Sequence, residues 1–120
     1  MTSFASRRFQ TWQFKVSHGE LLIRSPRNSV YSTNIDLMFA GVIYMDLPRH
    51  LGQIEIQQPD ETDVSFIRER LPKQGSSDKI FVLISNGRRY RVIAAAMQVS
   101  ENELEIFESP FKFDSRFGVS

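Results

Sequence analysis

An Asn-Gly pair between two β-branched runs is the feature that most restricts the fold of this chain. Asn86-Gly87 separates residues 79–84, Lys-Ile-Phe-Val-Leu-Ile, from residues 90–97, Tyr-Arg-Val-Ile-Ala-Ala-Ala-Met. A type I′ turn needs two positive φ angles, which Asn and Gly adopt readily, and its twist matches that of two antiparallel strands. The stretch therefore predicts a β-hairpin and, with it, a mainly β domain.

Alternation of apolar and polar residues predicts further strands on both sides of this hairpin. A period of two is typical of a strand with one buried face. The predicted strands cover residues 12–16, 20–24, 53–57 and 103–107, with turns expected at His18-Gly19 and at residues 100–102. Short turns between successive strands favour antiparallel pairing.

The longest alternating run covers residues 35–47, in which Ile35, Leu37 and Phe39 share one parity and Asp36 takes the other. An isolated glycine inside such a run is typical of a bulge or a sharp bend. We therefore expect a strong bend near Ala40-Gly41, as at a corner between two sheet regions.

One segment has the pattern of a helix instead. Asp60 suits a cap position, acids follow it in the first turn, and Arg68 and Arg70 come near the end, as the helix dipole favours. The predicted fold is mainly β (α+β): about seven mostly antiparallel strands in a small barrel or sandwich, with one short helix near residues 60–71. We expect a single domain over residues 1–120, with an aromatic C-terminal tail at residues 109–120.

Composition narrows the function classes. The chain has 120 residues, 41% of them apolar, and no cysteine, so disulfides and thiolate chemistry are excluded. The net charge of +1 is weaker than a dedicated nucleic-acid binder usually carries. No apolar run approaches the ~20 residues that cross a bilayer, and we expect a cytoplasmic location without membrane contact.

No motif gives a positive argument for an enzyme. Nucleophile-elbow, dinucleotide-binding and phosphate-loop patterns are missing from the sequence. The two histidines, His18 and His50, have no metal-ligand spacing between them. We therefore expect neither a cofactor nor a metal.

Basic residues around the predicted hairpin form the first candidate site. Guanidinium groups can bind phosphate or stack on a base. The candidate anion or nucleic-acid contacts are Arg24, Arg27, Arg88, Arg89 and Arg91. Along a strand Arg89 and Arg91 point to one face and Arg88 to the other, so at most two converge there. The alternative interpretation is a solvated face on which Arg91 pairs with Glu103 or Glu105.

The C-terminal segment forms the second candidate site. Residues 107–117 contain four of the ten phenylalanines. Burying a Phe stabilises by roughly 1.5–3 kcal/mol, so something is expected to cover them. Either the tail crosses back over its own core, or it docks on a second copy or a partner protein. The partner-binding candidates are Phe111, Phe113 and Phe117.

The preferred interpretation is a non-catalytic protein–protein interaction module, with self-association as a homodimer among its forms. The alternative is a small barrel that binds nucleic acid or phosphate through the basic hairpin patch. A third interpretation is a small-molecule pocket near Trp12, Gly41 and Tyr44.

Overall fold

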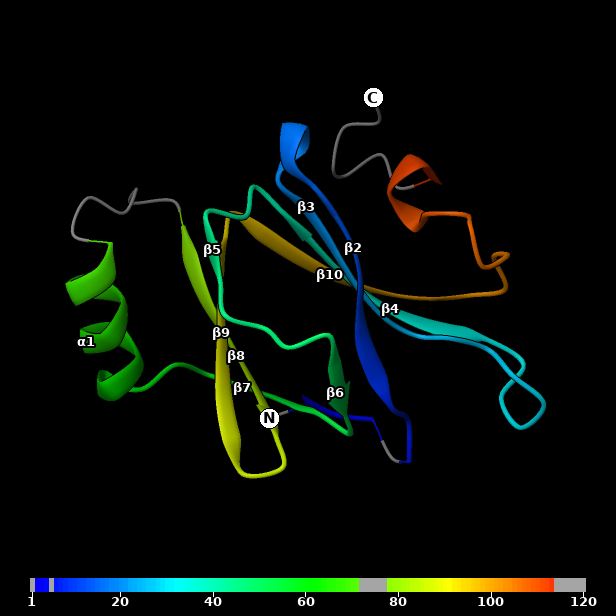
Figure 1. Cartoon of the computed structure of the whole chain (residues 1–120), viewed down its shortest axis with the longest axis horizontal. Helices are drawn as coiled ribbons and strands as arrows, with labels where there is room; N and C mark the ends of the chain where they lie inside the picture. The colour runs from blue at the N-terminus through cyan, green and yellow to red at the C-terminus, as the bar shows by residue number, and fades with distance from the viewer. Residues whose placement is uncertain (1, 5, 72–77, 114–120) are drawn as a thin grey trace.

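The computed structural model describes residues 2–4, 6–71 and 78–113, and the side chains of residues 2, 3, 112 and 113 lie outside that description. The fold consists of two five-stranded antiparallel sheets and one α-helix (Figure 1). The first sheet has the order β1-β7-β8-β9-β5 and the second β10-β4-β3-β2-β6. The first sheet comprises β1 (Thr2–Ser3), β7 (Glu55–Gln57), β8 (Lys79–Ser85), β9 (Arg88–Ala94) and β5 (Tyr44–Met45). The second comprises β10 (Ala96–Asn102), β4 (Asn34–Ala40), β3 (Glu20–Ser25), β2 (Phe9–Lys15) and β6 (His50–Gly52).

The predicted hairpin and helix are both confirmed. β8 and β9 pair from Lys79 and Ala94 to the turn, where Asn86 and Gly87 have φ angles of 52° and 75°. The helix α1 spans Glu61–Arg70 and begins with a capping box. Asp60 accepts the main-chain N–H of Asp63 at 3.0 Å, and Asp63 accepts that of Asp60 at 2.9 Å. Short 3₁₀ helices occupy Val16–His18 and Pro110–Phe113.

Two chain segments pass from one sheet into the other and confirm the predicted bend. β4 pairs with β10 in the second sheet. β5, which follows β4, and β9, which precedes β10, pair with each other in the first sheet. The chain bends at Gly41, where φ is +67° and a Cβ would lie 3.0 Å from the Cβ of Ala95. A side chain at position 41 would be strained in that conformation. The corner therefore needs the glycine.

The core lies between the two sheets. Its fully buried side chains come from both, and Leu37 and Phe39 project into it with Ile35 beside them, as the parity of β4 predicts. The core residues are Phe9, Leu21, Ile23, Leu37, Phe39, Leu51, Ile54, Leu83, Val92 and Ala94. Each sheet has two free edges in its hydrogen-bonding order, so no closed barrel is found among the strands described.

The opposite face of β4, which the alternation of residues 35–47 predicts to be exposed to solvent, is also buried. Met38 and Leu22 pack with Phe111 in a second apolar cluster, with Trp12 against it. The C-terminal segment crosses this face, whereas α1 lies beside the first sheet at the other end of the molecule (Figure 1).

The expected turn at residues 100–102 and the expected strand at 103–107 are both wrong. Residues 100–102 are the end of β10, and no strand is assigned to 103–107. The Asn102 side-chain oxygen accepts the Leu104 N–H at 3.2 Å, and the Glu108 N–H donates to the Glu105 carbonyl at 2.9 Å. These local bonds turn the chain instead of extending it.

Candidate interaction surface

A buried ion pair lies beneath residues 104–111, called here the C-terminal segment. Arg24 on β3 and Asp36 on β4 are directly opposite in register, and both side chains are 0% exposed. The Arg24 Nε and Nη2 groups donate to the two carboxylate oxygens of Asp36 at 2.7 and 3.0 Å. Asn102 Nδ2 donates to the same carboxylate at 2.9 Å. Asp36 is thus fully engaged from two neighbouring strands.

The same arginine holds the segment that covers it. Arg24 Nη2 donates to the main-chain carbonyl of Glu108 at 3.0 Å, and Nη1 donates to that of Ile106 at 3.4 Å. Asn34 Nδ2 donates to the carbonyl of Leu104 at 2.9 Å. Asp36 leaves three of the five N–H donors of Arg24 unused, and the carbonyl groups of the covering segment accept from two of these.

Residues 105–108 form a closed turn, called here the 105–108 turn. Besides the Glu108 N–H bond to the Glu105 carbonyl, the Glu105 N–H donates to the Glu108 carboxylate at 2.9 Å. Arg27 Nη2 pairs with the Glu105 carboxylate at 2.7 Å. The turn leaves two apolar side chains outside, Ile106 at 57% and Phe107 at 97% exposure.

A hollow adjoins these two side chains. Its volume is about 310 Å³, and its lining consists of Trp12, Gln13, Ile106, Phe107 and Glu108. Acidic residues of the same region, Glu101 and Glu103, are exposed. The surface therefore combines an apolar projection, an adjoining hollow and negative charge.

A second ionic cluster lies between α1 and β9. The Asp63 carboxylate is buried and accepts from Arg89 Nη2 at 2.5 Å and from Arg91 Nε at 2.8 Å. Burial alone would raise the pKa of Asp63, but hydrogen bonds from Arg89, from the Asp60 main chain and from Arg91 outweigh it and hold that pKa well below its usual range. The hydrogen bond to Asp63 in turn raises the pKa of Arg89. Asp63 therefore fastens the helix to the sheet.

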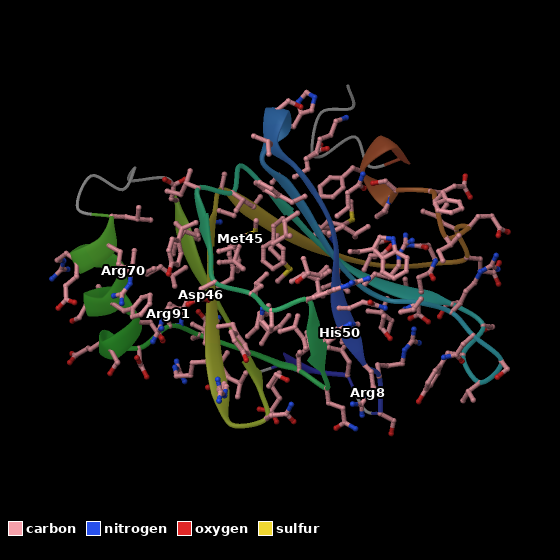
Figure 2. All side chains as sticks on the ribbon, in the orientation of Figure 1. Arg8, Met45, Asp46, His50, Arg70 and Arg91 are labelled. Atoms are coloured by element: carbon pink, nitrogen blue, oxygen red, sulfur yellow. The ribbon has the colours of Figure 1, made fainter. Side chains whose placement is uncertain are left out.

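Phe66 of α1 completes this cluster. The guanidinium carbons of Arg70 and Arg91 lie 3.6 and 3.9 Å from its ring centroid. Figure 2 shows Arg70, Asp46 and Arg91 close together between the helix and β5. Burial raises the pKa of Asp46, an effect that the Arg91 main-chain N–H, at 2.6 Å, and the charge of Arg91 partly offset.

The structure separates the five predicted basic residues. Arg24 and Arg27 hold the C-terminal segment. Arg89 and Arg91 share one face of β9, as expected, but both bind Asp63, while Arg88 is exposed at the hairpin end. The expected pairing of Arg91 with Glu103 or Glu105 is wrong, because α1 packs on that face. Phosphate contact by these residues stays a prediction.

The aromatic candidates are also divided. Phe111 is 7% exposed and packs on Leu22 and Met38, so at this residue the tail crosses its own core. The side chain of Phe113 and all of Phe117 lie outside the described residues, and partner binding by the three stays a prediction. Sequence reasoning missed the exposed position, Phe107, because Leu104 and Ile106 alternate with Glu103 and Glu105 as in a strand, and Phe107 was taken as the end of that strand. The glutamates on both sides of Ile106-Phe107 are a signal of exposure.

Comparisons with family models, with curated proteins and with solved structures found no match for this chain. Across residues 2–4, 6–71 and 78–113, no helix combines the length and the apolar character needed to cross a membrane.

Proposed function

We propose that this protein is a non-catalytic protein–protein interaction module whose 105–108 turn inserts Phe107 into an apolar pocket of a partner. The observation that carries the proposal is the 97% exposure of Phe107 on a turn whose main chain is bound by a buried arginine. The expected cytoplasmic location and a sandwich-like arrangement of the two open sheets belong to the same proposal.

The exposure of Phe107 is significant for binding because the turn that carries it is ordered. Single exposed apolar residues are normal on protein surfaces and need no explanation. Binding by a loose loop, however, loses about 0.5–1.5 kcal/mol for each side chain that it immobilises. The 105–108 turn is already closed by its own bonds and held by Arg24. From the roughly 1.5–3 kcal/mol of burying a Phe, binding then loses the cost of ordering the Phe107 side chain but no further cost of ordering the turn.

Charge defines the chemistry of the partner. Glu101, Glu103 and Glu105 precede Phe107 closely in the sequence and are exposed, and Glu105 also pairs with Arg27. Rim charges steer association and exclude partners of like charge more than they add affinity. The proposed partner surface is therefore a basic rim around an apolar pocket, on a second copy of the chain or on another protein.

Two matched variants test the proposal. Phe107→Asp removes the projection, and Val16→Asp changes a side chain of 80% exposure on the 3₁₀ helix Val16–His18 in the same way. Sedimentation velocity over a range of concentrations measures self-association of the wild-type chain and both variants. We expect Phe107→Asp to abolish association and Val16→Asp to leave it unchanged.

If the wild-type chain is monomeric throughout, a photo-reactive phenylalanine analogue placed at position 107 or at position 16 identifies a different partner in cells. We expect one discrete cross-linked protein from position 107 and none from position 16. Equal behaviour of the two positions in both experiments would contradict the proposal.

A further inference from the structure

Most arginine side chains that the structure describes have a partner. They bind a carboxylate, a main-chain carbonyl or an aromatic ring, as Arg7, Arg24, Arg27, Arg70, Arg89 and Arg91 do. Four others, Arg8, Arg49, Arg68 and Arg88, are exposed and make no side-chain hydrogen bond or ion pair to any residue described. Their positive charge is therefore unneutralised within the described part of the chain.

Three of these four lie at one end of the molecule, together with His50. Arg8 directly precedes Phe9, which pairs with Gly52, and His50 lies opposite Gln10. The carbonyl of Arg49 accepts the N–H of Thr11 at 2.8 Å. Figure 2 shows Arg8 and His50 near each other at this end. Arg68, by contrast, belongs to α1.

The β8–β9 hairpin brings Arg88 to the same end. Ser85 hydrogen-bonds through its hydroxyl to the carbonyl of Leu51 in β6, and Arg88 pairs with Ser85 across the hairpin. Arg88 has the parity of Tyr90 and Val92, which pack in the core, and not that of Arg89. It therefore leaves the sheet on the side of β6 and not on the side of α1. The hairpin turn and β6 lie together at the lower edge of Figure 1.

Gly52 leaves an open position between two N–H donors. Its φ is +72°, and the nearest heavy atoms to a Cβ at this residue would be Arg8 Nη2 at 3.8 Å and Asn86 Nδ2 at 4.0 Å. Neither of these groups donates to another described residue. The two donor groups come from different parts of the chain and flank the same empty position at Gly52. An oxyanion needs donors arranged in this way.

We propose that this surface, the basic end (Arg8, Arg49, His50 and Arg88 with Asn86), binds a phosphate group over Gly52. Guanidinium groups bind phosphate with charge-assisted, often bidentate hydrogen bonds. The phosphate belongs either to the backbone of a single-stranded oligonucleotide or to a small phosphorylated molecule. The site differs from the 105–108 turn in residues and in charge, so its failure leaves the proposed function intact.

A neighbouring acid gives the proposal a second, opposite test. Glu55 lines a hollow of about 420 Å³ that also borders Asn86 and Gly87. Its charge opposes an anion at the basic end. Removing that charge should therefore tighten binding.

The experiment titrates a fluorescein-labelled single-stranded 12-mer by anisotropy at 50 and 200 mM salt, and follows the Gly52 amide by NMR during addition of inorganic phosphate. For three contacted phosphates, the affinity for the 12-mer should fall roughly 20-fold between the two salt concentrations. Arg8→Gln should weaken binding by about tenfold, as loss of a charge-assisted bond does. Glu55→Gln should strengthen it. Arg68→Gln, the matched control, removes an equally unpaired exposed charge from α1 and should leave binding unchanged.

The two sources of phosphate give different results. Salt-sensitive binding of the 12-mer that exceeds the affinity for inorganic phosphate identifies the backbone, whereas a Gly52 shift with inorganic phosphate and no tighter binding of the 12-mer identifies a small ligand. Equal losses in Arg8→Gln and Arg68→Gln would overturn the proposal, since binding would then follow net charge alone. Absence of both responses at 50 mM salt would overturn it as well.

Discussion

The outer face of each sheet is covered by a segment that is held at a buried arginine–carboxylate pair. The carboxylate belongs to the sheet in one case and to the covering segment in the other. On the second sheet, Asp36 and Arg24 both belong to strands, and the covering segment contributes only main-chain carbonyl groups to Arg24. On the first sheet, the cover α1 carries Asp63, and β9 carries the arginines. The first arrangement seals a complete ion pair beneath its cover, whereas the second uses the ion pairs as the fastening.

The charged side chains of the two sites also differ in solvent exposure, so the loss of a partner should cost a different free energy at each site. Arg24 and Asp36 are both 0% exposed, whereas the two arginines that bind Asp63 are 9% (Arg91) and 29% (Arg89) exposed. A lone cation left in a dry site costs several kcal/mol, but a partly exposed one is hydrated by solvent. The pair on the second sheet should therefore tolerate less change, and the turn that it holds is the one that displays Phe107.

The largest expected effect follows from breaking the sealed pair. Asp36→Ala leaves Arg24 buried without a carboxylate and should lower the free energy of unfolding by about 3–5 kcal/mol. Urea denaturation measures this. The control replaces both partners, Arg24→Met with Asp36→Leu, and should recover most of the loss because no charge remains. A loss below about 1 kcal/mol in Asp36→Ala would refute the view that the site is dry.

A smaller loss is expected on the other sheet. Asp63→Ala removes the acceptor of Arg89 and Arg91 and half of the capping box, and should lower the free energy of unfolding by about 2–3 kcal/mol. Asp60 lies 3.5 Å from Arg89 and retains part of the pairing. Measured in the same urea series, a loss greater than that of Asp36→Ala would reverse the comparison.

The pH dependence of stability provides a second test of the contribution of Asp63. Because the pKa of Asp63 is lower in the folded state than in the unfolded chain, its contribution is complete above the ordinary carboxyl pKa of about 3.9. The contribution is lost as the pH falls through the folded value. Unfolding midpoints between about pH 5 and pH 2 should therefore fall less steeply in Asp63→Ala than in the wild-type chain. Parallel slopes would contradict the assignment.

The smallest effect is expected at Asp46. Its pKa is raised in the folded state, so between the unfolded and folded values stability falls as the pH rises. Asp46→Asn keeps an oxygen that can accept the Arg91 N–H and removes this dependence. At neutral pH it should change stability by no more than about 1 kcal/mol, in the stabilising direction, because solvent screens a half-buried charge. Thermal unfolding at neutral pH and near pH 5 checks the sign, and destabilisation at both would contradict it.

Local chemistry explains which elements the sequence predicts correctly. The Asn86-Gly87 turn, the Asp60 cap and the bend at Gly41 each depend on the backbone preferences of one or two residues. The shared face of Arg89 and Arg91 follows from strand parity alone. Such features need no knowledge of distant segments.

The wrong predictions concern segments whose structure depends on residues far away in the sequence. Residues 103–107 alternate like a strand, but Arg24 and Asn34, far away in sequence, bind their carbonyl groups. The partner of Arg89 and Arg91 belongs to a helix whose position no spacing reveals. Whether Phe107 or Phe111 is covered depends on the path of the same segment, which tertiary hydrogen bonds determine.

The central claim is that buried Arg24 holds the 105–108 turn in the shape that displays Phe107. Hydrogen exchange of the Glu108 amide, followed by NMR, tests this directly because that N–H closes the turn. In the double variant Arg24→Met with Asp36→Leu, we expect Glu108 to exchange at least about tenfold faster than in the wild-type chain, while the Phe39 amide in β4 keeps its protection. Unchanged exchange at Glu108 would show that the turn holds itself and would contradict the account.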